Sequence, residues 1–170
     1  ILLVLSLCIL LQFNLNSILI GALSVPLIII YPFLKRFTHW PQLGLGIVFN
    51  WGILIISIQF LDKISLDYLI LYFGCIFWTL AYDTIYAYQD IKDDLKNNIK
   101  STAVLFKEKG KKYVFLFYSV FFISIGFLGY RSSESFLSLI VIIVLIFVIG
   151  IYLNKWKINS VESSNYYFRY

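Results

Sequence analysis

Long uncharged runs of apolar residues alternate with shorter polar segments along the chain, and this pattern predicts membrane-spanning helices. A helix that crosses a bilayer needs about 20 mostly apolar residues. Six segments reach or approach this length: residues 1–13, 18–34, 43–61, 68–82, 113–130 and 136–153. The first is short, and helical character is expected to continue from the fourth through residues 83–95. We therefore predict an all-α, polytopic transmembrane helix bundle of about six spans, with residues 1–170 in one membrane-embedded domain.

The composition excludes several classes of protein. Apolar and aromatic residues make up 61% of the 170 residues, charged residues only 14%, and the mean hydropathy is +0.86. An average soluble domain is roughly half apolar and about one-quarter charged, so this chain has too few polar side chains to cover a water-soluble globule. Disordered, collagen-like and nucleic-acid-binding proteins have other compositions. We expect membrane lipid, and no nucleic acid, among the partners.

Lysine and arginine residues fall unequally on the two sides of the predicted bundle. When the loops are assigned to alternate sides, twelve of the 14 basic residues fall on one side, and Lys63 and Arg131 fall on the other. Loops with an excess of Lys and Arg face the cytoplasm in membrane proteins. The segment 83–112, which carries seven lysines, is therefore expected to form a cytoplasmic active-site loop.

Four aspartates, Asp83, Asp90, Asp93 and Asp94, cluster at the start of this loop. On a continuous helix, Asp83, Asp90 and Asp94 fall within about 40° of one another, whereas Asp93 lies about 80° away. Three carboxylates near a helix C-terminus repel one another and the helix dipole, and a divalent cation such as Mg²⁺ would relieve both effects. The alternative is a solvated acidic loop neutralised by neighbouring lysines. Asp83 favours a functional role, because it lies among aromatic residues at the end of a span.

A second candidate site consists of Tyr31 and Lys35, which are four residues apart on the same predicted side as the aspartates. Pro32 removes a backbone donor between them and can kink the span. If the two side chains share one helix face, Lys35 can hold a phosphate group beside the divalent cation expected at the aspartates. The alternative is an interfacial tyrosine followed by a lysine that reaches to the membrane surface.

The other reactive residues favour structural roles. Cys8 and Cys75 lie in apolar runs, and His39 has no second His or Cys at a metal-ligand spacing. The sequence contains no glycine-rich phosphate loop, no Cys-x-x-Cys pair and no nucleophile elbow. Nucleotide hydrolysis and zinc chemistry are therefore disfavoured. Aromatic residues near the segment ends, Trp156 among them, are typical of interfacial belts.

Two motifs resemble those of the UbiA superfamily of intramembrane aromatic prenyltransferases. One is similar to the second aspartate-rich motif of the superfamily and consists of Tyr82-Asp83-Thr84-x-Tyr86-Ala87-x-x-Asp90-x-x-Asp93-Asp94, followed by Ile99-Lys100-Ser101-Thr102-Ala103. The other is similar to its Tyr-x-x-x-Lys region and consists of Tyr31-Pro32-Phe33-x-Lys35-Arg36-Phe37-Thr38-His39-x-Pro41-Gln42. The spacing of the motifs and the order of the spans also agree, and the resemblance covers essentially all 170 residues.

The resemblance, which is nearest to the members that prenylate 4-hydroxybenzoate, implies a reaction and a set of site residues. A polyprenyl group passes from polyprenyl diphosphate to the ring of 4-hydroxybenzoate, ortho to the hydroxyl, in ubiquinone biosynthesis, with Mg²⁺ as cofactor. The expected metal ligands are Asp83, Asp90 and Asp94. Asp83 is also the expected catalytic residue, which orients the phenol or accepts its proton. The side chains expected to bind substrate are Tyr31, Lys35 and Tyr86.

The chain departs from the superfamily pattern in one respect. Members have about nine spans and an earlier aspartate-rich motif of the Asn-Asp-x-x-Asp-x-x-x-Asp kind, whereas no acidic residue precedes Asp62 here. The polar tail 155–170 also stops about where a last span would follow. We therefore expect the chain to represent the middle and C-terminal part of the enzyme, and to be inactive by itself.

Two alternatives to this function remain open. The acceptor can belong to menaquinone, haem or chlorophyll synthesis within the same superfamily, or the chain can be a non-enzymatic transporter subunit. A transporter more often places charges at mid-membrane or in paired broken helices, whereas the charge clusters here lie at one interface. The resemblance implies a bacterial plasma membrane with the 83–112 loop in the cytoplasm, or the mitochondrial inner membrane in a eukaryote.

Overall fold

The structure, a computed structural model, describes residues 2–169 and consists of helices joined by loops. In chain order the helices are α1 (Leu2–Leu10), α2 (Leu15–Ile30), η1 (Tyr31–Phe33), α3 (Leu34–Phe37), α4 (Pro41–Phe49), α5 (Gly52–Leu61), α6 (Leu66–Ala87), α7 (Ile91–Lys96), α8 (Thr102–Phe106), η2 (Lys107–Lys109), α9 (Gly110–Ser133), α10 (Leu137–Asn154) and α11 (Val161–Arg169). The elements η1 and η2 are 3-10 helices. The all-α fold predicted from the sequence is confirmed.

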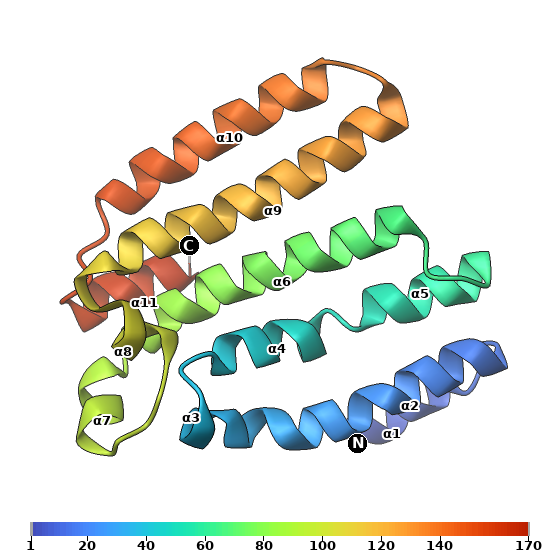
Figure 1. Cartoon of the computed structure of the whole chain (residues 1–170), viewed down its shortest axis with the longest axis horizontal. Coiled ribbons are helices and arrows are strands. Elements are labelled where there is room, and N and C mark those ends of the chain that lie inside the picture. Colours follow the sequence, from blue (N-terminus) through green and yellow to red (C-terminus); the bar gives the residue numbers. More distant parts are fainter. Residues whose placement is uncertain (1, 170) are drawn as a thin grey trace.

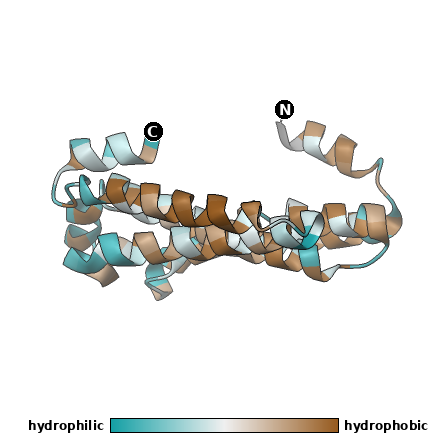
Figure 2. Cartoon of the chain, turned by 90° about the horizontal axis from the view of Figure 1, so that it is seen from above, coloured by the Kyte–Doolittle hydropathy of each residue, from teal (hydrophilic) through white to brown (hydrophobic). Residues whose placement is uncertain are grey.

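The long helices lie side by side in a single layer (Figure 1). Across the layer the order is α10, α9, α6, α4 with α5, and α2. The helix α6 lies in the middle, where it packs against α9 on one side and α4 on the other. Seen from above, α1 and α11 lie on the same face of this layer (Figure 2). The middle helix, which carries Asp83 and Tyr86, is therefore packed between neighbours on both sides.

Five helical stretches of the described residues are long and apolar enough to cross a membrane: Leu15–Phe37, Pro41–Leu61, Leu66–Ala87, Thr102–Ser133 and Leu137–Asn154. Each corresponds to a segment expected from the hydropathy pattern. The remaining segment, 1–13, differs from the prediction. Its helix α1 has nine residues, about half the length that a crossing needs, and residue 1 lies outside the described residues. Five spans, rather than six, are thus present in the part of the chain that the structure describes.

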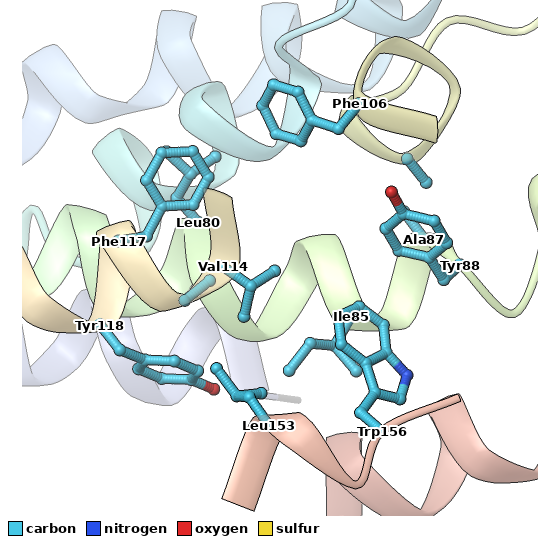
Figure 3. Packing of buried hydrophobic residues seen from close by; sticks show 12 residues of the cluster. Leu80, Ile85, Ala87, Tyr88, Phe106, Val114, Phe117, Tyr118, Leu153 and Trp156 are labelled. Atoms are coloured by element: carbon cyan, nitrogen blue, oxygen red, sulfur yellow. The ribbon is translucent and has the colours of Figure 1, made fainter. Parts of the chain in front are cut away.

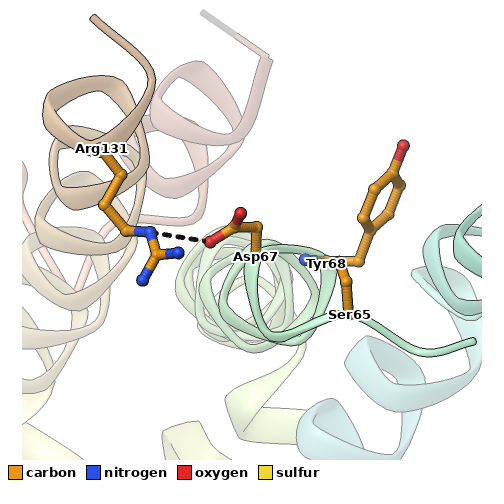
Figure 4. A network of polar contacts seen from close by, with 4 residues as sticks. All are labelled: Ser65, Asp67, Tyr68 and Arg131. Carbon is orange, nitrogen blue, oxygen red and sulfur yellow. Dashed lines mark hydrogen bonds and ion pairs between the residues drawn. The ribbon is translucent and has the colours of Figure 1, made fainter. Parts of the chain in front are cut away.

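The two ends of the layer carry different loops. The elements α3, α7 and α8 lie at one end, which we call the lysine-rich end, and the α5–α6 and α9–α10 loops lie at the other (Figure 1). At that other end, Arg131 Nε and Asp67 Oδ1 form a half-exposed salt bridge of 3.0 Å between α9 and α6 (Figure 4). Beside it, Ser65 caps α6 by accepting a hydrogen bond from Tyr68 N–H at 3.4 Å. The two ends therefore separate the basic residues as the charge pattern predicts.

The fourth span ends in a turn instead of continuing as one helix through residue 95. The helix α6 ends at Ala87, and α7 begins at Ile91 after a short turn. Within the turn, the buried Tyr88 donates its hydroxyl hydrogen to the Lys107 carbonyl, and its ring lies edge-on to Trp156 with 5.2 Å between centroids. The prediction of a continuous helix is wrong, because these contacts hold Tyr88 in the core and turn the chain there.

The apolar core lies toward the lysine-rich end (Figure 3). Its buried residues are Leu80, Ala81, Ile85, Ala87, Tyr88, Ala103, Phe106, Val114, Phe117, Tyr118, Leu153 and Trp156. Gly110 lets α9 begin against Tyr88, because a Cβ at this position would overlap the tyrosine hydroxyl. Trp156 is fully buried instead of lying in an interfacial belt, and its indole N–H donates to Ser164 Oγ at 3.0 Å. The expected polar tail therefore folds as α11, which packs against α6.

The stretch Pro41–Leu61 is interrupted between α4 and α5, around Asn50. A break inside a membrane frees backbone groups that need hydrogen-bond partners. The Asn50 side-chain amide donates to the carbonyls of Gly46 and Cys75, at 2.8 and 3.1 Å, and to Thr79 Oγ1 at 2.9 Å. Asn50 thus links the interruption between α4 and α5 to α6 through hydrogen bonds between uncharged groups.

Cysteine labelling of Asn98 and Ser132 tests this arrangement. Both side chains are exposed, one in the α7–α8 loop and the other near the end of α9. With Cys8 and Cys75 replaced by serine, a membrane-impermeant maleimide is expected to label only one of the two introduced cysteines in sealed vesicles. Detergent permeabilisation should expose both. Labelling of both positions in sealed vesicles would show that the topology is wrong.

Candidate active site

A buried hydrogen-bonded group joins three helices at the lysine-rich end. Thr84 Oγ1 on α6 lies 2.8 Å from Thr102 Oγ1 at the start of α8, and both residues are buried. The Thr102 backbone N–H donates to Gln42 Oε1 on α4 at 3.1 Å, and Gln42 is also buried. Because an unpaired buried polar group is costly, these bonds fix the start of α8 relative to the two spans.

The loop before α8 is held against the segment that follows α2. Lys100 donates from its backbone N–H to the Lys35 carbonyl at 3.0 Å and from Nζ to the Phe37 carbonyl at 3.1 Å. These residues belong to the two different sequence motifs, 31–42 and 82–103. The structure therefore brings the motifs into direct contact at one end of the layer.

Lys35 lies close enough to interact electrostatically with both Asp83 on α6 and Asp94 on α7. Asp83 is partly buried, and Asp94 is only 9% exposed. Burial raises the pKa of Asp94, a hydrogen bond from the Ser101 side chain and the Lys35 ammonium lower it, and nearby Asp90 raises it. A cationic ligand would favour the charged form of Asp94 further. One lysine and two carboxylates, from α3, α6 and α7, thus form the candidate site.

The other two aspartates of the cluster are exposed. Asp90 precedes α7, and Asp93 lies in its first turn. Because the helix is interrupted at Tyr88, Asp83 does not share a single helix face with Asp90 and Asp94, as the periodicity suggested. Within residues 2–169, no group of three or more His, Cys, Asp or Glu side chains is arranged to hold a metal ion.

The available donors nevertheless suit Mg²⁺ bound together with a phosphate group. Mg²⁺ prefers oxygen ligands and typically takes only one or two from protein carboxylates. Asp90 and Asp94 are four residues apart, and the charges of Asp90 and Asp93 both raise the pKa of Asp94. In the described part of the chain, Gln89 Nε2 and His39 Nδ1 are buried without a hydrogen-bond partner. Neither nitrogen is accessible at the surface of the described residues, so neither is assigned to the site.

The two tyrosines expected to bind substrate have different surroundings. Tyr31 is partly buried and begins η1, one turn before Lys35. Tyr86 is 42% exposed, and its ring centroid lies 4.9 Å from that of Phe168 on α11. Tyr82 contacts the same phenylalanine, with 6.1 Å between centroids. The structure thus places Tyr31 near Lys35 and Tyr86 against α11.

Sequence reasoning assigned no role to four residues that shape the site, namely Gln42, Ser101, Thr102 and Phe168. A signal existed for the first three, because polar side chains next to apolar helices often make buried hydrogen bonds. No comparable signal existed for Phe168, whose contacts depend on how α11 folds back onto α6. Gln42 and Thr102 are positioning residues for the loop.

Paired substitution of Thr84 and Thr102 by valine tests the buried contact. Either single change leaves the other hydroxyl unpaired, so we expect each to lower the free energy of unfolding by about 1–3 kcal/mol. Changing both to valine should cost less than either single change, because no polar group is left alone. Reversible unfolding in SDS–detergent mixtures measures these energies. Ser119→Ala, which removes a hydroxyl that donates to the Phe115 carbonyl within its own helix, is the control, and additive losses would contradict the pairing.

Comparison with known proteins identifies the family. The model of the UbiA prenyltransferase family matches residues 1–170. The chain is 46% identical over 137 residues to 4-hydroxybenzoate polyprenyltransferase, mitochondrial, of Bos taurus, a match that covers 78% of this chain and 36% of the relative. The protein of the same name from Homo sapiens is 43% identical over 137 residues, with the same two shares. The 4-hydroxybenzoate octaprenyltransferase of Pasteurella multocida is 40% identical over 120 residues, which are 71% of this chain and 41% of the relative.

No solved structure matches the chain significantly. The matched region represents 36% of the length of the bovine and human relatives. The family model, in contrast, covers the whole chain, including both motifs that meet around Lys35. The chain therefore belongs to the UbiA prenyltransferase family.

Proposed function

We propose that the enzyme containing this chain transfers a polyprenyl group from polyprenyl diphosphate to the ring of 4-hydroxybenzoate, ortho to the hydroxyl, in ubiquinone biosynthesis. The names of the relatives support the substrates. The observation that carries the proposal is the position of Lys35 beside Asp83 and Asp94, because the reaction must hold an anionic leaving group next to acidic residues. We also infer that activity requires a further aspartate-rich segment, and that residues 1–170 alone are inactive.

The first chemical event breaks the bond between the allylic carbon and a diphosphate oxygen, and the electron pair leaves with the diphosphate. Lys35 binds the diphosphate oxygens and stabilises the charge that they gain. Asp90 and Asp94 would hold Mg²⁺, which when bound supplies additional positive charge at the leaving group.

The second event forms a bond between the allylic carbon and the ring carbon ortho to the hydroxyl, and that ring carbon then releases its proton to solvent, which restores the aromatic ring. Asp83 lies on the span itself, deeper than the residues of α7. We therefore assign it to the aromatic acceptor, where its carboxylate orients the phenol or accepts the phenolic proton. Asp83 is also proposed to complete the metal site. Tyr31 and Tyr86 are assigned to substrate binding.

We infer that the lysine-rich end faces the cytoplasm of a bacterium, or the corresponding side of the mitochondrial inner membrane. The excess of basic residues at this end supports the orientation. A site at this membrane surface gives the soluble aromatic acid and the membrane-bound polyprenyl chain access to the same point. The labelling of Asn98 described above, done in vesicles of known orientation, tests the side.

Substitution of Lys35 separates binding of the two substrates. In the active enzyme, Lys35→Ala is expected to raise the KM for polyprenyl diphosphate about 10- to 100-fold. This is the effect expected when one charged hydrogen-bonding group is lost. The KM for 4-hydroxybenzoate should change by no more than about twofold, since this ligand does not carry the diphosphate. Arg36→Ala, an exposed neighbour, is the matched control. Equal effects on both KM values would instead favour a membrane-surface role for Lys35.

Substitution of each aspartate by asparagine separates metal binding from proton transfer. Asp90→Asn and Asp94→Asn are expected to weaken Mg²⁺-dependent diphosphate binding at least about tenfold. Asp83→Asn should retain most of this binding but lose turnover about 100-fold or more. Asp93→Asn, at an exposed position, should remain active. Calorimetric titration with diphosphate and single-turnover rates measure the two effects, and an inactive Asp93→Asn beside a normal Asp90→Asn would refute the assignment.

A further inference from the structure

The spacing between α9 and α10 changes along their length. Toward the α9–α10 loop the helices are in close contact, because a Cβ at Gly126 would overlap Ile142 and one at Gly129 would lie 3.2 Å from Ser138 Cβ. Toward the lysine-rich end the two helices line a cavity of about 640 Å³. Ligand pockets typically have volumes of about 300–1,000 Å³. The cavity is thus large enough for part of a small ligand or one lipid chain.

The walls of this cavity are apolar and open to the outside of the layer. Phe115 on α9 and Ile143 and Phe147 on α10 line it, and the two α10 side chains are each 68% exposed. Phe115 packs closely on Gly150, where a Cβ would lie 3.2 Å from the ring, so a larger side chain at this position would enter the groove. Among the described residues, only those of α9 and α10 line this groove.

Two lysines lie where the groove reaches the membrane surface. Lys111 and Lys112 line the cavity in the first turn of α9, and Lys111 Nζ donates to the Asn154 carbonyl on α10 at 3.0 Å. Cations at a helix N-terminus oppose the helix dipole, so a bound anion would stabilise this arrangement. Among the described residues, the one salt bridge joins Asp67 to Arg131 at the far end. Within residues 2–169, neither Lys111 nor Lys112 forms a salt bridge with a carboxylate.

We propose that this groove binds an anionic phospholipid. One acyl chain lies against Phe115, Ile143 and Phe147, and the headgroup phosphate contacts the ammonium groups of Lys111 and Lys112. The apolar wall and the ammonium groups at its end match the two parts of such a lipid. Basic pockets between transmembrane helices are known to bind phosphate-bearing headgroups.

The groove is separate from the proposed active site. The helix α6 lies between α9 and α4 (Figure 1), and the segment that carries Lys35 is next to α4. Neither Lys35 nor the carboxylates of Asp83 and Asp94 line the cavity. An isoprenoid diphosphate bound in the groove would therefore be on the wrong side of α6 for transfer, which favours a lipid of the surrounding membrane.

Lipid titration of the purified protein, followed by native mass spectrometry, tests the proposal. With phosphatidylglycerol and phosphatidylcholine of identical acyl chains, we expect preferential binding of phosphatidylglycerol. The double variant Lys111→Gln, Lys112→Gln should raise its Kd about thirtyfold, equivalent to about 1 kcal/mol for each lysine. The corresponding double arginine variant should keep the preference, which distinguishes loss of charge from misfolding.

Matched controls locate the site. Lys63→Gln removes the same charge at the opposite end and should change the Kd by less than about twofold. Gly150→Leu should fill the groove and weaken binding, whereas Gly52→Leu, at a position where a Cβ meets no neighbour, should not. Equal affinity for the two lipids, an unchanged Kd in the double glutamine variant, or competitive displacement by a polyprenyl diphosphate analogue would each overturn the proposal. The readout is lipid binding, so its result is independent of prenyl transfer.

Discussion

The buried hydrogen bond between Thr84 and Thr102 is the contact on which the candidate site depends. Thr84 belongs to α6, which packs against α4 and α9, and Thr102 begins the helix after the aspartate-bearing loop. Gln42 adds α4 to the same group through the Thr102 N–H. Because all three side chains are shielded from water, a displaced loop would leave them unpaired. This penalty keeps the loop in one position relative to the spans.

The position of the loop in turn determines the electrostatics of the site. Lys100 connects the loop to the carbonyls of Lys35 and Phe37, so the segment that carries the cation is fixed together with the segment that carries Asp94. Lys35 acts electrostatically on both Asp83 and Asp94. The lysine gives both a counter-charge, and a metal-bound diphosphate could take over this role without a rearrangement of the helices.

Hydropathy was sufficient to predict the long helices, because a run of about 20 apolar residues has few stable conformations in a bilayer other than a helix. The resemblance supplied the predicted site residues, namely Tyr31, Lys35, Asp83, Tyr86, Asp90 and Asp94, but not the buried contacts of Gln42 and Thr102 that position the loop. The end of α6 was not predictable. Tyr88 is held there by Lys107 and Trp156, and both residues lie far from it in the sequence. Because of this turn, Asp94 is buried and Asp90 is exposed. Helical periodicity calculated for one continuous helix does not predict this difference.

The lysines of the lysine-rich end differ in which groups neutralise their charge. This difference distinguishes lysines that bind a ligand from lysines that only orient the protein in the membrane. A lysine that only orients the protein can be solvated anywhere on its side of the bilayer. Lys35 instead acts electrostatically on two carboxylates of the same chain, and in the proposed function a bound diphosphate competes with them for its charge. Lys111 and Lys112 lie at the end of an apolar groove on the far side of α6, with no carboxylate paired to them among the described residues. Their counter-charge must come from outside the protein, and in a membrane the anions that also fit an apolar groove are phospholipids.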